Sequence, residues 1–348
     1  DVTKFDGINV RGTFQYKLNE KISLQSGWDI NYESGSGGRI KEGTQSIGDY
    51  AFFVSSEWKV SSRVQIRPGV RLVHNTIYQA PPFIPSINTK LALSTKHDVR
   101  LSYGRGFRAP SLRELYFDFF DANHQIEGNP NLEAELSHSI NGSWNWRMME
   151  TNNISLTSVV GAYYNAIDNM IGFSLRPGTI ITSYINIDKY KTKGVNWNLT
   201  GKVKSLEVKG GVGYMGTFNQ YSESNNDLDE FVWTPEATGS ATYKLRAQNM
   251  TFSLYYKFTG ETPAYEEVQM NGENEVRLTK ISSFNWADFS VQKGMGKHIS
   301  FTAGVRNLLD VTNVSNTATN SAVHTGGGAR SVGNGRSFFF NVSYSLIK

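Results

Sequence analysis

Residues 101–146 read LSYGRGFRAPSLRELYFDFFDANHQIEGNPNLEAELSHSINGSWNW, and they predict a strand, a long connection and a second strand. The first strand alternates apolar Leu101 and Tyr103 with Ser102 and Gly104. The second strand has one polar face, and its other face carries Leu136, His138, Ile140, Gly142, Trp144 and Trp146. A period of two residues indicates β-structure. The connection is too long for a hairpin turn and is rich in aromatic residues, and long connections without regular structure tend to be functional.

The same alternation continues along most of the chain and predicts fifteen strands. Besides 99–104 and 136–146, these are 8–18, 22–32, 50–60, 63–74, 87–95, 154–164, 184–203, 206–218, 234–245, 250–260, 286–293, 298–309 and 336–348. Strands of ~9–11 residues are long enough to cross a bilayer. A soluble sandwich would bury apolar inner faces, whereas strands 8–18 and 22–32 each have one face without apolar side chains. The pattern predicts an all-β fold, a transmembrane antiparallel β-barrel.

The connections between the predicted strands alternate between short turns and long loops. Residues 19–21 and 61–62 are short turns, whereas 34–48, 170–178 and 261–285 are predicted to be long loops without strands. Outer-membrane barrels have short periplasmic turns and longer extracellular loops. The asymmetry therefore favours a barrel of this type.

The composition excludes several other classes of protein. The chain has no cysteine, so disulfides, zinc–thiolate sites and cysteine nucleophiles are excluded. No run of 18 apolar residues occurs, which excludes a transmembrane helix. The net charge is +4, with acidic and basic residues mixed, so there is no sign of a nucleic-acid partner. No Gly-x-Ser-x-Gly motif accompanies the six histidines, and we do not expect an enzyme.

Two tetrads lie in and beside the long connection. Phe107, Arg108, Ala109 and Pro110 form the sequence FRAP, and Asn129, Pro130, Asn131 and Leu132 form NPNL. Their order and spacing resemble the FRAP and NPNL boxes of TonB-dependent outer-membrane receptors. Further resemblance is found at Tyr184, Asn186, Lys191, Gly194 and Val195, and at residues 306–311.

The resemblance implies a ligand-gated barrel in the outer membrane of a Gram-negative bacterium, surrounded by outer-membrane lipid. Proteins of this family import scarce ligands such as haem, ferric siderophores and cobalamin, and the TonB–ExbB–ExbD complex energises them through a plug domain. We expect high-affinity uptake of a metal chelate, with haem or a ferric siderophore first and cobalamin as the alternative. A passive diffusion porin is the alternative of another class, but we find no constriction of facing charges in the sequence.

The strand count places the chain within such a receptor. Single-chain bacterial barrels have an even number of strands, so fifteen strands predict a part of a barrel. If the whole has the 22 strands of plugged transporters, residues 1–348 are strands 8–22, without the plug domain. The connection that contains the boxes then joins strands 13 and 14 and is the seventh outer loop, where the family has it.

The resemblance also suggests ligand-binding residues in the connection. They are His124, Arg108, Tyr116, Phe119 and Phe120. In haem receptors that resemble this chain, a histidine between the boxes binds the iron, and His124 has that position; the alternative is an exposed loop histidine. The aromatic residues either stack on a flat ligand or pack the loop. Arg108 either binds propionates or catecholate-type anions or has a structural role in the lumen.

Overall fold

The computed structural model describes residues 2–121, 125–176, 179–223, 225–270, 273–318 and 328–346. The protein is nearly all-β, with 71% of residues in strands and 4% in helices. Two compact units are distinguished, and each is described by itself. The first unit comprises Asp1–Leu93, Asp98–Gly142 and Tyr163–Thr192, and the second comprises Ser94–His97, Ser143–Ala162 and Lys193–Lys348.

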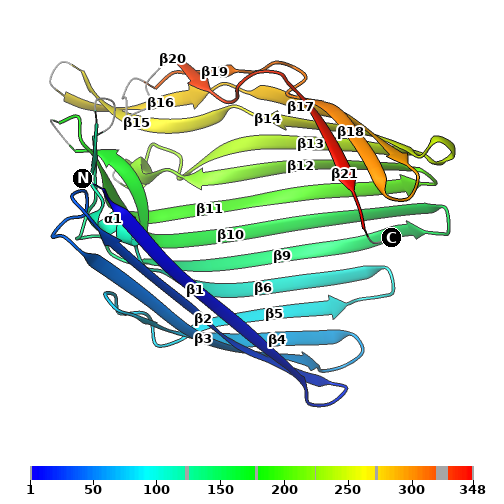
Figure 1. Ribbon diagram of the computed structural model, residues 1–348, viewed down its shortest axis with the longest axis horizontal. Helices are drawn as coiled ribbons and strands as arrows, with labels where there is room; N and C mark the ends of the chain where they lie inside the picture. Colours follow the sequence, from blue (N-terminus) through cyan, green and yellow to red (C-terminus); the bar gives the residue numbers. More distant parts are fainter. Residues whose placement is uncertain are drawn as a thin grey trace. The chain divides into compact units, whose positions relative to one another are not determined.

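The first unit begins with an antiparallel meander, coloured blue to cyan in Figure 1. Each strand pairs with the next, and the register places Val10 opposite Ile30 and Trp28 opposite Phe52. The meander consists of β1 (Lys4–Lys17), β2 (Ile22–Ser36), β3 (Gln45–Lys59), β4 (Val64–Asn75), β5 (Ile84–Ala92) and β6 (His97–Arg108). Three short elements follow β6, namely α1 (Leu112–Tyr116), β7 (Phe119–Phe120) and β8 (Gln125–Glu127).

Three long strands contribute residues to both units: β9 (Glu135–Glu150), β10 (Ile154–Leu175) and β11 (Thr182–Val203). The second unit continues as an antiparallel ladder in the order β12, β13, β14, β17, β18 and β21. Their bounds are β12 (Leu206–Phe218), β13 (Phe231–Leu245), β14 (Met250–Thr259), β17 (Phe284–Met295), β18 (Ile299–Arg306) and β21 (Ser337–Tyr344), and the 3₁₀ turns are η1 (Gln220–Glu223) and η2 (Arg246–Gln248). A separate small sheet contains β15 (Thr262–Met270), β16 (Glu273–Ile281), β19 (Asn313–Asn316) and β20 (Gly328–Ser331).

All fifteen predicted strands are present, as β1–β6, β9–β14, β17, β18 and β21. Two predictions about the loops are wrong. Residues 261–285 contain the hairpin β15–β16 instead of an irregular loop, and β10 continues to Leu175 through most of the predicted loop 170–178. The connection 109–134 also has regular structure, because it contains α1, β7 and β8. The alternation of Val276 and Leu278 with Arg277 and Thr279 was a usable strand signal in the first of these segments.

The long strands expose large apolar side chains on one face. In β1, Ile8, Val10 and Phe14 are 60%, 47% and 61% exposed. The opposite face is polar, with Asp29 Oδ2 lying 3.6 Å from Arg11 Nη2 and 3.5 Å from Arg71 Nη2. Such a continuous exposed apolar face is typical of a surface that is covered by a membrane or a partner. No helix in the described ranges has the length and apolar character needed to span a membrane.

Candidate functional site

A five-residue helix, α1, lies at the start of the connection between the two boxes. Ser111 is its N-cap: the Ser111 hydroxyl accepts from Glu114 N at 3.3 Å, and the Glu114 carboxylate accepts from Ser111 N at 2.7 Å. This reciprocal pair is a capping box, which satisfies backbone donors at a helix start. The preceding Pro110 is fully buried. The end of the FRAP box therefore directs the chain into a helix with a defined first turn.

The helix buries its apolar side chains in a cluster that we call the loop core, formed by Ile40, Ile47, Leu112, Leu115 and Leu132. Leu112 and Leu115 are 0% and 1% exposed, and Leu132, the last residue of the NPNL box, is 3% exposed. Gly35 provides room for the helix, because a Cβ at this position would lie 2.8 Å from Leu112 Cδ2. The connection is thus a packed element rather than a solvated linker.

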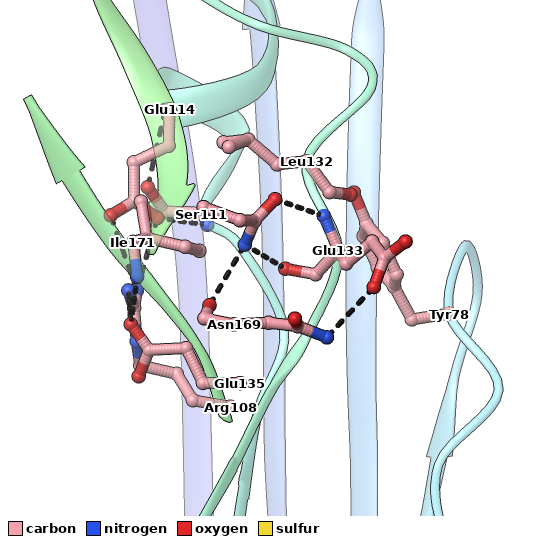
Figure 2. Close-up of polar contacts among 10 residues, drawn as sticks. Tyr78, Arg108, Ser111, Glu114, Leu132, Glu133, Glu135, Asn169 and Ile171 are labelled. Carbon is pink, nitrogen blue, oxygen red and sulfur yellow. Dashed lines mark hydrogen bonds and ion pairs between the residues drawn. The ribbon is translucent and has the colours of Figure 1, made fainter. Parts of the chain in front are cut away.

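Arg108, in the FRAP box, connects three segments around this core (Figure 2). Its guanidinium donates to both carboxylate oxygens of Glu114, at 3.2 and 3.0 Å, and to Glu135 Oε1 at 2.6 Å. The same oxygen of Glu135 accepts from Ile171 N at 2.8 Å. Arg108 therefore ties α1 to the first residue of β9 and, through Glu135, to β10. Its side chain remains 44% exposed, so an external anion has access to it.

The NPNL box is fixed mainly by hydrogen bonds to backbone atoms. Asn129 Nδ2 donates to Tyr184 O at 2.8 Å, and Asn129 Oδ1 accepts from Asn131 N at 3.0 Å. The Tyr78 hydroxyl donates to Leu132 O at 2.8 Å. Burial raises the pKa of Tyr78 to about 12, so the phenol keeps its proton and its donor role at physiological pH. Tyr78 and Tyr184 thus fasten the box to the loop between β4 and β5 and to the start of β11.

The residue after the box is held by Asn186. Its side-chain oxygen accepts from Glu133 N at 2.8 Å, and its nitrogen donates to Glu133 O at 3.0 Å and to Asn169 O at 2.8 Å. Asn169 has a φ of 57°, in the left-handed region, and donates to Glu133 Oε2 at 2.7 Å (Figure 2). Asn186, one of the residues that resemble the receptor family, therefore links the segment after the NPNL box to β10 by hydrogen bonds.

A second charged cluster lies on the other side of the box. Lys41 Nζ donates to Glu127 Oε1 at 2.9 Å and to Gly128 O at 2.8 Å, and Arg176 Nη2 lies 2.6 Å from Glu127 Oε2. The hydrogen bond from Lys41, outweighing partial desolvation and helped by the charges of Lys41 and Arg176, holds the pKa of Glu127 below its usual range. A cavity of about 410 Å³ lies between this cluster, the NPNL segment and residues 183–185 of β11.

The candidate ligand residues have different surroundings in the structure. Tyr116 packs against the loop core, and Phe119 lies 6.2 Å from the Phe117 ring, with the Arg39 guanidinium 4.8 Å above it. Phe120 is 48% exposed. His124 lies outside the described residues. Among the described residues, no group of three or more His, Cys, Asp or Glu side chains has a geometry suited to a metal ion.

Sequence reasoning missed the residues that hold the boxes in place, namely Lys41, Tyr78, Gly128, Glu135 and Asn169. Glu114 was detectable, because Ser-x-x-Glu before an apolar run is a sequence signature of a helix start. Lys41, Tyr78 and Asn169 come from distant parts of the chain, and no local pattern identifies them or the two residues near the NPNL box, Gly128 and Glu135.

Replacing Arg108 with alanine is expected to destabilise the connection by about 1–3 kcal/mol, since two mostly buried carboxylates lose their charged donor. Hydrogen exchange at residues 111–118 and 169–173 should become faster in the purified receptor. Arg100→Ala is the matched control, because Arg100 is 63% exposed and its ion pair is with Asp98 of its own strand. Unchanged exchange in Arg108→Ala, together with weaker ligand binding, would show a purely ligand-binding role.

Acid should loosen the Lys41–Glu127–Arg176 cluster. Because the folded-state pKa of Glu127 is depressed, its pairing stabilises the loop fully above the usual glutamate pKa, and this contribution is lost as the pH falls through the lower, folded pKa. We expect faster proteolysis at residues 118–132 as the pH falls from 6 to about 3. Glu127→Gln should abolish most of this pH dependence of proteolysis. If the rate of proteolysis in the variant still rises with acid as in the wild type, other carboxylates cause the pH dependence.

The fold and its paired boxes define a class, the antiparallel β-barrel receptors. A family model, TonB dependent receptor-like, beta-barrel, matches residues 3–308. The chain therefore belongs to the TonB-dependent receptor family, which confirms the predicted fold class. This is a family of receptors and transporters rather than of enzymes, and its barrels are outer-membrane proteins of Gram-negative bacteria.

Solved structures resemble the chain over almost all of its length. A mutant of the ferric enterobactin receptor PfeA from Pseudomonas aeruginosa, in complex with enterobactin, has a TM-score of 0.74 at 17% identity over 98% of this chain and 54% of its own. The siderophore receptor PirA from Pseudomonas aeruginosa has a TM-score of 0.69 at 16% identity, and the match covers 99% of this chain and 57% of the receptor. The FrpB iron transporter from Neisseria meningitidis has a TM-score of 0.68 at 12% identity, and the match covers 98% of this chain and 55% of the transporter.

The chain thus spans little more than half the length of these structures. Comparison with curated protein sequences finds no match.

Proposed function

We propose that residues 1–348 are the barrel wall and outer loops of an outer-membrane receptor for high-affinity uptake of a metal chelate. The observation that carries the proposal is the packed connection between the FRAP and NPNL boxes, within a chain of this family. A packed loop pays less ordering entropy on binding than a mobile one, which favours tight capture of a dilute ligand.

The chemistry of the loop fits a flat or aromatic anionic chelate. Phe120 offers an exposed ring, Phe119 lies beneath the Arg39 guanidinium, and Arg108 is partly accessible. Aromatic faces stack on planar groups, and guanidinium groups bind carboxylate and catecholate oxygens. A ferric siderophore is our first candidate; the similar structures include receptors described as binding enterobactin or as siderophore receptors. Haem is the second, on the sequence position of His124, with cobalamin as the remaining alternative.

In this proposal the barrel lies in the outer membrane of a Gram-negative bacterium, with its exposed apolar faces, including Phe338 and Phe340 of β21, in contact with lipid. Loops capture the chelate, and the TonB–ExbB–ExbD complex, acting on a plug domain of the whole receptor, supplies the energy for its passage.

Binding of a ferric catecholate siderophore to the whole receptor, followed by tryptophan fluorescence quenching, tests the proposal. Phe120→Leu keeps an apolar side chain but removes the ring, and should weaken binding about two- to tenfold. Phe14→Leu is the control, since Phe14 is an exposed ring near the end of β1, in a strand and not in the loop. Equal affinity in both variants would remove Phe120 from the site.

His124→Ala separates the two candidate ligands. If haem is the ligand and His124 binds its iron, the substitution should weaken haem binding and shift the Soret band. If haem binding and the spectrum stay unchanged while siderophore binding is present, the haem assignment is wrong and the receptor assignment stands. Deletion of residues 119–128 tests the loop as a whole, and normal affinity for every chelate after the deletion would contradict the proposed site.

A further inference from the structure

The second unit has an apolar groove on the exposed face of its strands, with a volume of about 460 Å³. Its floor includes the small side chain of Ala237, which the register places between Val212 of β12 and Phe258 of β14. Its walls include Trp197 and Tyr214, which are 50% and 47% exposed. The groove is therefore formed by small residues of one strand between large apolar residues of its neighbours.

One end of this groove carries an aromatic cluster and a cation. The Tyr214 and Trp233 rings stack with their centroids 4.7 Å apart and an interplanar angle of 15°. Phe231, two residues before Trp233 in β13, lies on the same face, with its ring centroid 6.4 Å from that of Trp233. Lys193 Nζ lies 3.6 Å from the Phe231 ring centroid and 5.6 Å from that of Trp233. No carboxylate within the described ranges pairs with Lys193. The ammonium group thus lies over the Phe231 ring in a cation–π contact, and its charge is available to an external anion.

The connections show which end of the strands this is. At the Lys193 end, β12 and β13 are joined by residues 219–230, whereas β11 and β12 are joined at the other end by Lys204 and Ser205 alone. In outer-membrane barrels the long connections are extracellular. Lys193 therefore lies nearer the outer surface than Trp197, which is four residues, about 13 Å, further along β11.

We propose that this face holds one phosphate-bearing lipid, with its phosphate on Lys193 and an acyl chain in the groove. The cation, the amphipathic rings and the apolar groove follow one another in the order headgroup, interface and acyl chain. The lipid site is separate from chelate capture and does not depend on the identity of the chelate.

Native mass spectrometry of the whole receptor in mild detergent tests this, with dioleoylphosphatidylglycerol and dioleoylglycerol as probes. Lys193→Gln should lower the affinity for the phospholipid about fivefold and leave the phosphate-free lipid unaffected. Ala237→Leu, which fills the groove, should lower the affinity for both. Lys209→Gln is the control, because Lys209 lies on the opposite face of β12 and pairs with Glu207 at 2.9 Å; it should change neither.

Two results would overturn the proposal. Phospholipid binding by Lys193→Gln and Ala237→Leu at the wild-type level would show that lipid attaches elsewhere. An equal loss in Lys193→Gln and Lys209→Gln would show that attraction to the total charge, rather than a site, retains the lipid. Unchanged siderophore binding in Lys193→Gln and Ala237→Leu verifies that these variants are folded and keeps the lipid site distinct from the chelate site.

Discussion

Replacing Leu112 with alanine should destabilise the connection between β6 and β9 by about 2–5 kcal/mol, as is usual for a leucine removed from a packed core. Leu112 is 0% exposed and lies in the loop core, which draws residues from β3, α1, the NPNL box and the loop before β3. The residue that lies against Leu112 at position 35 is a glycine, which has no side chain. Position 35 therefore cannot fill the cavity that the substitution of Leu112 leaves. The loss should appear as faster hydrogen exchange at residues 111–132.

The strand ladder should keep its stability in this variant, because Leu112 itself lies in α1, outside the pairing of β1–β6. Unfolding of the barrel in urea is therefore expected to change little, while siderophore binding falls with the loss of loop order. Leu101→Ala is the matched control: Leu101 lies in β6 and is 53% exposed. If the hydrogen exchange rates at residues 111–132 are the same in Leu112→Ala and Leu101→Ala, the loop core does not stabilise the connection.

The strands were predictable because the physics that forms them is local and repetitive. A polar face next to an exposed apolar face forces a period of two along each strand, and this period survives whatever the ligand is. Residues 261–285 were misread as an irregular loop, although Asn271-Gly272, typical of tight hairpin turns, lies between their two alternating runs.

The candidate site was predictable only as a region. The two boxes mark where the connection begins and ends, but their partners Lys41, Tyr78 and Asn186 are far away in sequence. Whether Arg108 binds a ligand or braces the loop depends on where Glu114 and Glu135 lie in space. The structure shows its guanidinium occupied by both carboxylates, which a list of charged residues does not reveal.

Gly128→Ala should displace the NPNL box at a cost of about 1–3 kcal/mol, although it adds only one methyl group. A Cβ there would lie 2.8 Å from Leu115 O and 2.9 Å from Phe117 N, and backbone atoms cannot turn aside as side chains can. The displacement also strains the bonds of Gly128 to Asp118 and Lys41. Faster exchange at residues 115–132 and weaker siderophore binding are expected. A Cβ added at Gly104 in β6 would have no neighbouring atom within 4 Å, so the control variant Gly104→Ala should behave like the wild type. Equal exchange and binding in the two variants would contradict close packing at Gly128.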